Sequence, residues 1–235
     1  MATGSVWQVT REKQHYFDLL ASTWDKGMAA EVLSGLGNIV EEVGIVPGSR
    51  VVDLGSGTGV LLPFLISQLG NEGKIIALDF SAAMLREAKA RNFPALVSFV
   101  QADVHEIPLA DNCIDLAICN NAFPHFVDKG RALKEIARIL REDGRLVICH
   151  TMSWERINNL HRSLGGVVAS DLIPEKSILQ GLIAKARLEV VRFEDSEQRY
   201  LVVARKVTRS FMVEKFLRLD AIYGNSYQSQ TNNRR

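Results

Sequence analysis

Val51-Val-Asp-Leu-Gly-Ser-Gly-Thr-Gly-Val-Leu61 is the stretch from which the fold is predicted. An apolar run ending in an acid is followed by glycines at 55, 57 and 59 and then by apolar residues at helical spacing, a pattern typical of a buried strand that turns sharply into a helix. Glycines at alternate positions let the backbone approach a ligand closely, and the unpaired N–H groups of the new helix point toward it. The turn therefore predicts a binding site for a small molecule with a nucleotide-like part.

Composition limits the class of protein. The 235 residues, 47% hydrophobic and 23% charged, suffice for one sizeable core with appendages, and a net charge of +1 predicts no general attraction to nucleic acid or anionic lipid. No apolar run reaches about 18 residues and the start lacks a signal-peptide pattern, so no membrane insertion is expected. Cys113, Cys119 and Cys149 contain no CxxC pair, which favours free thiols of a reducing cytoplasm over a zinc site.

Outward from the opening stretch, apolar strands alternate with helices. Strands are expected at 50–54, 74–79, 97–101, 114–119 and 145–150, after two helices at 12–24 and 26–43. This alternation predicts parallel βαβ units with helices on both faces of the sheet. Two further strands, 188–193 and 198–204, are joined by a loop so short that they must be antiparallel. The expected class is thus a doubly wound α/β sheet of seven strands, mostly parallel, with a terminal antiparallel pair.

Several of these features together resemble the class I S-adenosylmethionine-dependent methyltransferases, of the small-molecule group that includes quinone-biosynthesis enzymes. The resemblance covers roughly residues 40–206. It rests on Asp53-x-Gly55-x-Gly57-x-Gly59, on Asp79 and Asp103 closing the second and third strands, and on Asn120 after the fourth. It implies a Rossmann-like fold, S-adenosylmethionine as cofactor, and methyl transfer to a small-molecule acceptor.

The resemblance also divides the chain. Residues 1–46 would form an N-terminal helical lid and 47–206 the methyltransferase core, in which a helical insertion at about 151–186 builds the acceptor pocket. Residues 207–235 are expected to be a C-terminal helix and a flexible tail. From Arg205 onward there are seven Lys or Arg residues against two acids, but no RNA-binding motif. A solvated tail or a helix that forms a homodimer is therefore favoured over a nucleic-acid site.

Polar strand ends predict where the cofactor lies, because ligands of open parallel sheets sit outside the carboxyl ends of the strands. The resemblance places the methionine part on the glycine loop with Asp53 near its amino group. It places the ribose on Asp79, since one carboxylate can accept hydrogen bonds from both vicinal hydroxyls. Asp103 and the Val104 amide would bind the adenine edge. The implied cofactor-binding residues are Asp53, Gly55, Ser56, Gly57, Gly59, Asp79, Phe80, Met84, Asp103, Val104 and Asn120, with Tyr16 and Trp24 from the lid.

Three histidines are candidates for the catalytic base. Displacement at a sulfonium methyl has a neutral leaving group, so the protein need only align the acceptor and remove its proton. His125, His150 and His161 follow the fourth and fifth strands, and an imidazole pKa of about 6.5 suits a base at neutral pH. Each can equally be a hydrogen-bonded structural residue. A metal or metalloid-like substrate held by all three is disfavoured, because their spacing matches no recognised metal pattern.

Two functions stay open at this point. The first is a small-molecule methyltransferase, and the second is a non-catalytic S-adenosylmethionine-binding or regulatory protein, since a fold alone does not establish chemistry. Nicotinamide and flavin proteins favour G-x-G-x-x-G, but Val60 and Leu62 occupy the positions of its third glycine here. The sequence does not indicate which acceptor is methylated.

Overall fold

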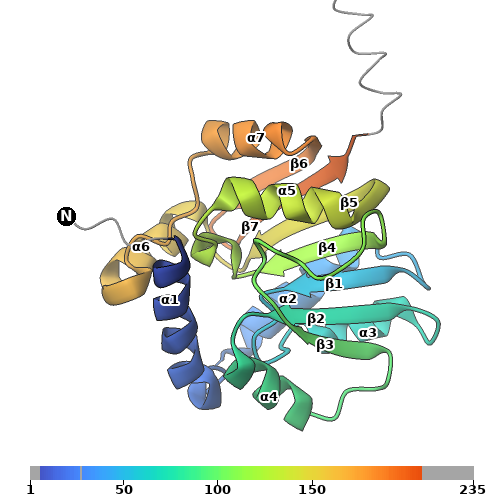
Figure 1. Ribbon diagram of the computed structural model, residues 1–235, viewed down its shortest axis with the longest axis horizontal. Helices are drawn as coiled ribbons and strands as arrows, with labels where there is room; N and C mark the ends of the chain where they lie inside the picture. Colours follow the sequence, from blue (N-terminus) through green and yellow to red (C-terminus); the bar gives the residue numbers. More distant parts are fainter. Residues whose placement is uncertain (1–5, 27, 208–235) are drawn as a thin grey trace, which may run out of the picture.

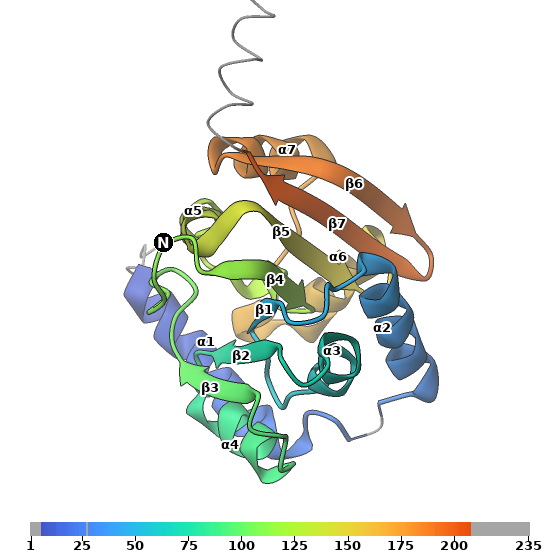
Figure 2. The same ribbon diagram turned by 90° about the vertical axis from the view of Figure 1, so that its right-hand side faces the viewer.

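The computed structural model describes residues 6–26 and 28–207 as one seven-stranded sheet with helices on both faces (Figures 1 and 2). The strands are β1 (Arg50–Leu54), β2 (Lys74–Asp79), β3 (Val97–Gln101), β4 (Ile114–Asn120), β5 (Leu140–His150), β6 (Leu188–Ser196) and β7 (Arg199–Lys206). The α-helices are α1 (Val6–Leu20), α2 (Ala30–Val43), α3 (Leu62–Leu69), α4 (Ala82–Ala90), α5 (Lys129–Ile139), α6 (Trp154–Leu164) and α7 (Lys176–Lys185). Short 3₁₀ helices are η1 (Ala21–Thr23), η2 (Phe123–His125) and η3 (Gly166–Val168).

The sheet has the strand order β3-β2-β1-β4-β5-β7-β6. Strands β1 to β5 pair with one another in parallel, whereas β7 is antiparallel to both β5 and β6. The predicted Rossmann-like α/β fold with a terminal antiparallel pair is therefore confirmed. The chain order reverses between β1 and β4, and this is the place where an open α/β sheet leaves a crevice for a ligand.

Helices cover both faces of the sheet, which explains why the central parallel strands are largely apolar instead of alternating. On one face, α2 and α3 pack through Leu36, Ile39 and Leu65; on the other, α5 packs through Leu133 and Ile136. In Figure 1, α5 lies in front of the sheet and α2 and α3 lie behind it, while α1 runs across the carboxyl ends of the parallel strands.

Local signals set most helix ends as expected. The Ser81 hydroxyl accepts a hydrogen bond from the Met84 amide at 3.1 Å, and Asp128 accepts one from the Arg131 amide at 2.9 Å, so these residues begin α4 and α5. Pro63 lies in the first turn of α3, where its missing N–H costs nothing. Caps of this kind explain why the core helices begin where the sequence places them.

The two N-terminal helices differ from the prediction. α1 starts at Val6 and ends at Leu20, and the chain then passes through η1, so the expected continuous helix to residue 24 is wrong. α2 starts at Ala30 instead of 26, which leaves Met28 in the connection between the two helices, where it lines the cavity described below.

Strand ends near the antiparallel pair also differ. β5 starts at Leu140 instead of 145, because Asp143 adopts a left-handed backbone (φ +59°) inside the strand and the pairing with β4 shifts there. The β6–β7 loop shortens to residues 197–198, because the antiparallel pairing of the two strands continues to Ser196 and Arg199. α7 begins at Lys176, two residues after the expected Pro174.

The predicted C-terminal helix lies outside the described residues apart from Val207, so the dimer and tail expectations stay predictions. Cys119 in β4 and Cys149 in β5 are buried free thiols, as expected. Among the described residues, no helix combines the length and apolar character that crossing a membrane requires.

Candidate functional site

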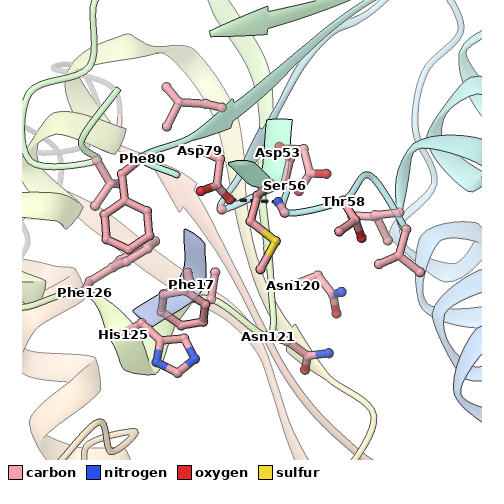
Figure 3. A pocket seen from close by; sticks show the side chains of 18 of the residues that line it. Phe17, Asp53, Ser56, Thr58, Asp79, Phe80, Asn120, Asn121, His125 and Phe126 are labelled. Atoms are coloured by element: carbon pink, nitrogen blue, oxygen red, sulfur yellow. Dashed lines mark hydrogen bonds between the residues drawn. The ribbon is translucent and has the colours of Figure 1, made fainter. Parts of the chain in front are cut away.

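A cavity of about 130 Å³ lies at the carboxyl ends of β1, β2 and β4, beneath α1 (Figure 3). Its walls come from α1 and α2 with their connection, from the glycine loop with the strand ends, and from the segment after β4. The N-terminal helices and their connection contribute Thr10, Phe17, Trp24, Met28, Val32 and Leu36; the loop and strand ends contribute Asp53, Gly55, Ser56, Gly57, Thr58, Val60, Asp79, Phe80, Met84, Asp103, Val104, His105 and Asn120; the last segment contributes Asn121, Ala122, His125, Phe126 and Val127. Of the expected cofactor residues, Gly59 and Tyr16 do not line the cavity. Nearly all the expected cofactor residues are therefore brought together.

The glycine loop admits no side chain at two points. At Gly55 (φ +71°) an added Cβ would lie 2.4 Å from the Cβ of Ala122, and at Gly59 (φ +82°) it would lie 2.9 Å from Cδ1 of Leu62. The amides of Gly55 and Ser56 both donate to the Leu78 carbonyl, at 2.8 and 3.0 Å, which fastens the loop to β2. Gly55 and Gly57 line the cavity without a side chain, so a ligand can approach the backbone closely there.

Asp79 connects this loop to α4. Its Oδ2 accepts from the Gly57 amide and its Oδ1 from the Ser81 amide, each at 2.8 Å (Figure 3 draws the first). Because a carboxylate oxygen has two lone pairs, each oxygen keeps one for a further donor. Burial raises the pKa of Asp79 to about 6, although the two amides oppose the rise. The carboxylate is therefore fixed in place and still able to accept from a vicinal diol.

Asp53 and Ser56 carry buried polar atoms without partners. Neither Oδ2 of Asp53 nor Oγ of Ser56 has a hydrogen-bond partner among the described residues, and both residues line the cavity. Burial raises the pKa of Asp53 to about 8, and the charge of Asp79 adds to the rise. A buried carboxyl group that lacks a partner is costly unless a ligand supplies one. This pair fits a ligand that brings a cationic donor, such as the ammonium group of an amino acid.

Asp103 and His105 form the far wall. Oδ1 of Asp103 accepts from the His105 amide at 2.9 Å and pairs with the His105 ring at 2.5 Å. Burial opposes ionisation of Asp103, but these bonds outweigh it and lower its pKa, so the residue is a permanent acceptor. His105 lines the cavity and was missed from the sequence, although its position two residues after a strand-end acid was the available signal.

Polar contacts hold α1 over the site. Gln14 Nε2 donates to the Phe80 carbonyl at 2.8 Å, and Asp18 Oδ1 accepts from the Ser81 hydroxyl at 2.5 Å and from the Ala83 amide at 3.2 Å. Asp18 therefore lies at the amino end of α4, where a negative charge is favoured. These bonds fix α1 to the cofactor side of the cavity.

Aromatic residues of α1 and of the connection to α2 face the cavity unequally. Trp24 lines it, as expected, whereas Tyr16 does not and packs edge-on against Phe17 with ring centroids 5.3 Å apart. Phe17 itself lines the cavity and lies 4.9 Å from the ring of His125.

The three candidate histidines occupy different environments. His125 lines the cavity, while His150 and His161 do not. His150 is buried beside Tyr200 with its Nε2 unpartnered, and burial lowers its pKa to about 3. His161 packs 4.9 Å from His125 and bonds through Nδ1 to the Asp171 carbonyl. No group of three or more His, Cys, Asp or Glu residues in the described part of the chain is arranged to hold a metal ion.

Two charged residues beside His125 were not predicted. Asp171, in the loop before α7, lies 2.8 Å from Nδ1 of His125 through its Oδ2. Lys13, on α1, pairs with the other oxygen of Asp171 and donates to the His125 carbonyl at 3.3 Å. Only 4% of Lys13 and 2% of Asp171 is exposed. The sequence contained one signal for Lys13. It lies four residues before Phe17, so both side chains are on the same face of α1, the face that packs toward the cavity.

Comparison with known proteins indicates the family to which the chain belongs. A protein-family model described as a methyltransferase domain matches residues 45–194. The demethylmenaquinone methyltransferase of Corynebacterium kroppenstedtii is 38% identical over 104 residues, which are 44% of this chain and 42% of the relative. A ubiquinone/menaquinone biosynthesis C-methyltransferase of Vibrio campbellii is 32% identical over 177 residues, covering 64% of this chain and 68% of that protein. The chain spans about half the length of several curated relatives that it matches.

A solved structure supports the same fold. The S-adenosylmethionine-dependent methyltransferase of Aquifex aeolicus superposes with a TM-score of 0.67 at 22% identity, over 81% of this chain and 98% of that chain.

Proposed function

We propose that this chain, which belongs to the family of class I S-adenosylmethionine-dependent methyltransferase domains, transfers the methyl group of S-adenosylmethionine to a small-molecule acceptor. One observation carries the proposal. A glycine loop whose Gly55 and Gly57 line the cavity without a side chain stands between two carboxyl groups: that of Asp53, which is buried and whose Oδ2 has no partner among the described residues, and that of Asp79, which can still accept hydrogen bonds. This donor and acceptor set fits a ligand that has both an ammonium group and a ribose.

S-adenosylmethionine would supply a methyl group activated on a sulfonium sulfur. Asp53 would bind its ammonium group, Asp79 the ribose hydroxyls, and Asp103 with the Val104 amide the adenine edge. Phe80 and Met84 line the cavity beside Asp79 and would offer apolar surface to the adenine ring. Helix α1, which covers the cavity, would exclude water and help to orient the acceptor.

We assign removal of the acceptor's proton to His125. It is the one of the three candidate histidines that lines the cavity, and burial lowers its pKa even though Asp171 opposes the shift. The ring is therefore neutral at neutral pH and able to take a proton. His161 does not line the cavity and packs instead against the ring of His125. His150 has a pKa too low for this role.

The acceptor side of the cavity is mainly apolar. Phe17, Met28, Val32, Leu36 and Phe126 contribute its walls, and His125 is the titratable residue among them. Such walls suit an acceptor with a flat or aliphatic apolar body and one polar position. The quinones named for the two curated relatives have this character, and a related hydroquinone or phenol is the acceptor class we propose.

Calorimetry with S-adenosylmethionine tests the cofactor site. Two hydrogen bonds to the charged Asp79 contribute about 1.5–3 kcal/mol each, so Asp79→Ala is expected to weaken binding by roughly 100-fold or more. Asp115→Ala is the matched control, because Asp115 caps the opposite end of the sheet by accepting from the Arg50 amide at 2.6 Å. Equal affinities for the wild type and Asp79→Ala would overturn the assignment.

Release of S-adenosylhomocysteine with a panel of quinol, phenol, thiol and amine acceptors tests turnover. Binding of the cofactor without turnover on any of them would favour the non-catalytic, cofactor-binding alternative instead.

A further inference from the structure

A buried chain of charges lies behind His125, on the side away from the glycine loop. It consists of Lys13 from α1, Asp171 from the loop after η3, and His125 from η2; Lys13 and Asp171 are 158 positions apart in the chain. The two Asp171 oxygens are divided between partners: Oδ1 meets the ammonium group of Lys13 and Oδ2 meets Nδ1 of His125. Three distant segments therefore converge on one carboxylate.

This arrangement determines where His125 carries its proton. Burial opposes the ionisation of Asp171, but its contacts with His125 and Lys13 outweigh this effect and lower its pKa. The carboxylate is therefore ionised and can only accept hydrogen bonds. The His125 nitrogen facing it must then be Nδ1–H. In the neutral ring, Nε2 is consequently the nitrogen with a free lone pair.

We propose that Asp171 and Lys13 are positioning residues that hold His125 in the Nδ1–H tautomer, so that its Nε2 serves as the base in the cavity. The inference rests on the proposed function for the role of His125, but the tautomer itself is independent of any reaction. Lys13 belongs to the lid helix, and it also donates to the His125 carbonyl.

Other charged or titratable groups near His125 do not replace this contact. Lys129, on α5, donates to the carbonyls of Pro124 and Phe126 at 2.8 and 3.0 Å and not to Asp171. The ring of His161, on α6, bonds to the backbone carbonyl of Asp171 and leaves both carboxylate oxygens to Lys13 and His125. His150, on β5, is neutral because burial lowers its pKa to about 3.

Asp171→Asn gives a specific expectation because asparagine offers one acceptor oxygen and two donor hydrogens. The Lys13 ammonium group takes the oxygen, since a charged donor forms the stronger bond. The amide NH₂ then faces His125 and requires a bare Nδ1, which moves the ring proton to Nε2 and removes the base. In Lys13→Met/Asp171→Asn the oxygen is free to turn back to His125, and the original tautomer returns.

Long-range proton–nitrogen NMR of the histidine rings in ¹⁵N-labelled protein at neutral pH tests this without an acceptor. His125→Gln identifies the signals of His125 among the five histidines. We expect Nδ1–H in the wild type, Nε2–H in Asp171→Asn, and Nδ1–H again in the double variant. Lys129→Met is the matched control, because it removes a neighbouring, partly buried lysine and leaves the tautomer unchanged.

Turnover with an acceptor from the panel should follow the tautomer. Asp171→Asn is expected to lower kcat by about 10²- to 10⁴-fold, the range of general base catalysis, with KM for S-adenosylmethionine unchanged and partial recovery in the double variant. An Nε2–H signal in the wild type would overturn the proposal even if no variant folded. So would an Asp171→Asn ring that keeps Nδ1–H, or a double variant without recovery, which is the result of a purely structural ion pair.

Discussion

Replacing Gly55 with alanine probes the close contact between the glycine loop and the segment after β4. A non-glycine residue in the left-handed region costs about 1–2 kcal/mol, and Gly55 has φ +71°. The added Cβ would also lie 2.4 Å from the Cβ of Ala122, a distance that requires the backbone to move. Overpacking of this kind costs about 1–3 kcal/mol, so we expect the free energy of unfolding to fall by about 2–5 kcal/mol.

Gly48→Ala is the matched control, because Gly48 has φ +81° but no atom within 4 Å of an added Cβ. It should lose only about 1–2 kcal/mol. Urea unfolding followed by circular dichroism without ligand measures both variants. Gly55→Ala/Ala122→Gly, compared with Ala122→Gly alone, should recover the overpacking part. Equal losses for Gly55→Ala and Gly48→Ala, or no recovery in the double variant, would refute the packing argument.

Two further predictions concern Asp53 and Trp24. The pKa of Asp53 in the folded protein, about 8, exceeds its ordinary value of 3.8, so the folded protein holds this proton more tightly and loses stability as the pH rises between these values. Asp53→Asn should therefore make the fall of the unfolding free energy with pH shallower, as measured by urea titrations at a series of pH values. An unchanged slope would contradict the assigned burial of Asp53. Trp24 lines the cavity, whereas Trp7 lies outside it and is 61% exposed. The change in tryptophan fluorescence on adding S-adenosylmethionine should therefore disappear in Trp24→Phe and persist in Trp7→Phe. A change that persists in Trp24→Phe would show that Trp24 does not contact the ligand.

Strand positions were predictable where an apolar run ends in turn residues. β1, β2 and β3 begin and end at the predicted residues, because each is an apolar run with glycine, proline or polar residues nearby, and because helices bury most of β1 and β2. The start of β5 was not, since Asp143-Gly144 is typical of a turn but here lies within a strand whose pairing shifts. Pairing with β4 decides that boundary, and local sequence does not contain it.

The two halves of the site differ in the same way. The cofactor half lies at consecutive strand ends between Asp53 and Val104, so their order along the chain was enough to predict a common crevice. The group behind His125 joins residues 13, 125 and 171, and only the packing of α1 against the sheet brings them together. Lys13 resembles a surface charge of an amphipathic helix, and Asp171 resembles an ordinary loop acid.

Helix α1 bonds through separate side chains to residues beside both halves of the cavity. Gln14 and Asp18 bond to residues that follow Asp79, and Lys13 bonds to Asp171 and His125. Any ligand that favours the docked helix at one half therefore lowers the cost of docking for a ligand at the other. Binding of the methyl donor and of the acceptor should be cooperative, and by thermodynamic reciprocity each should raise the affinity for the other by the same factor.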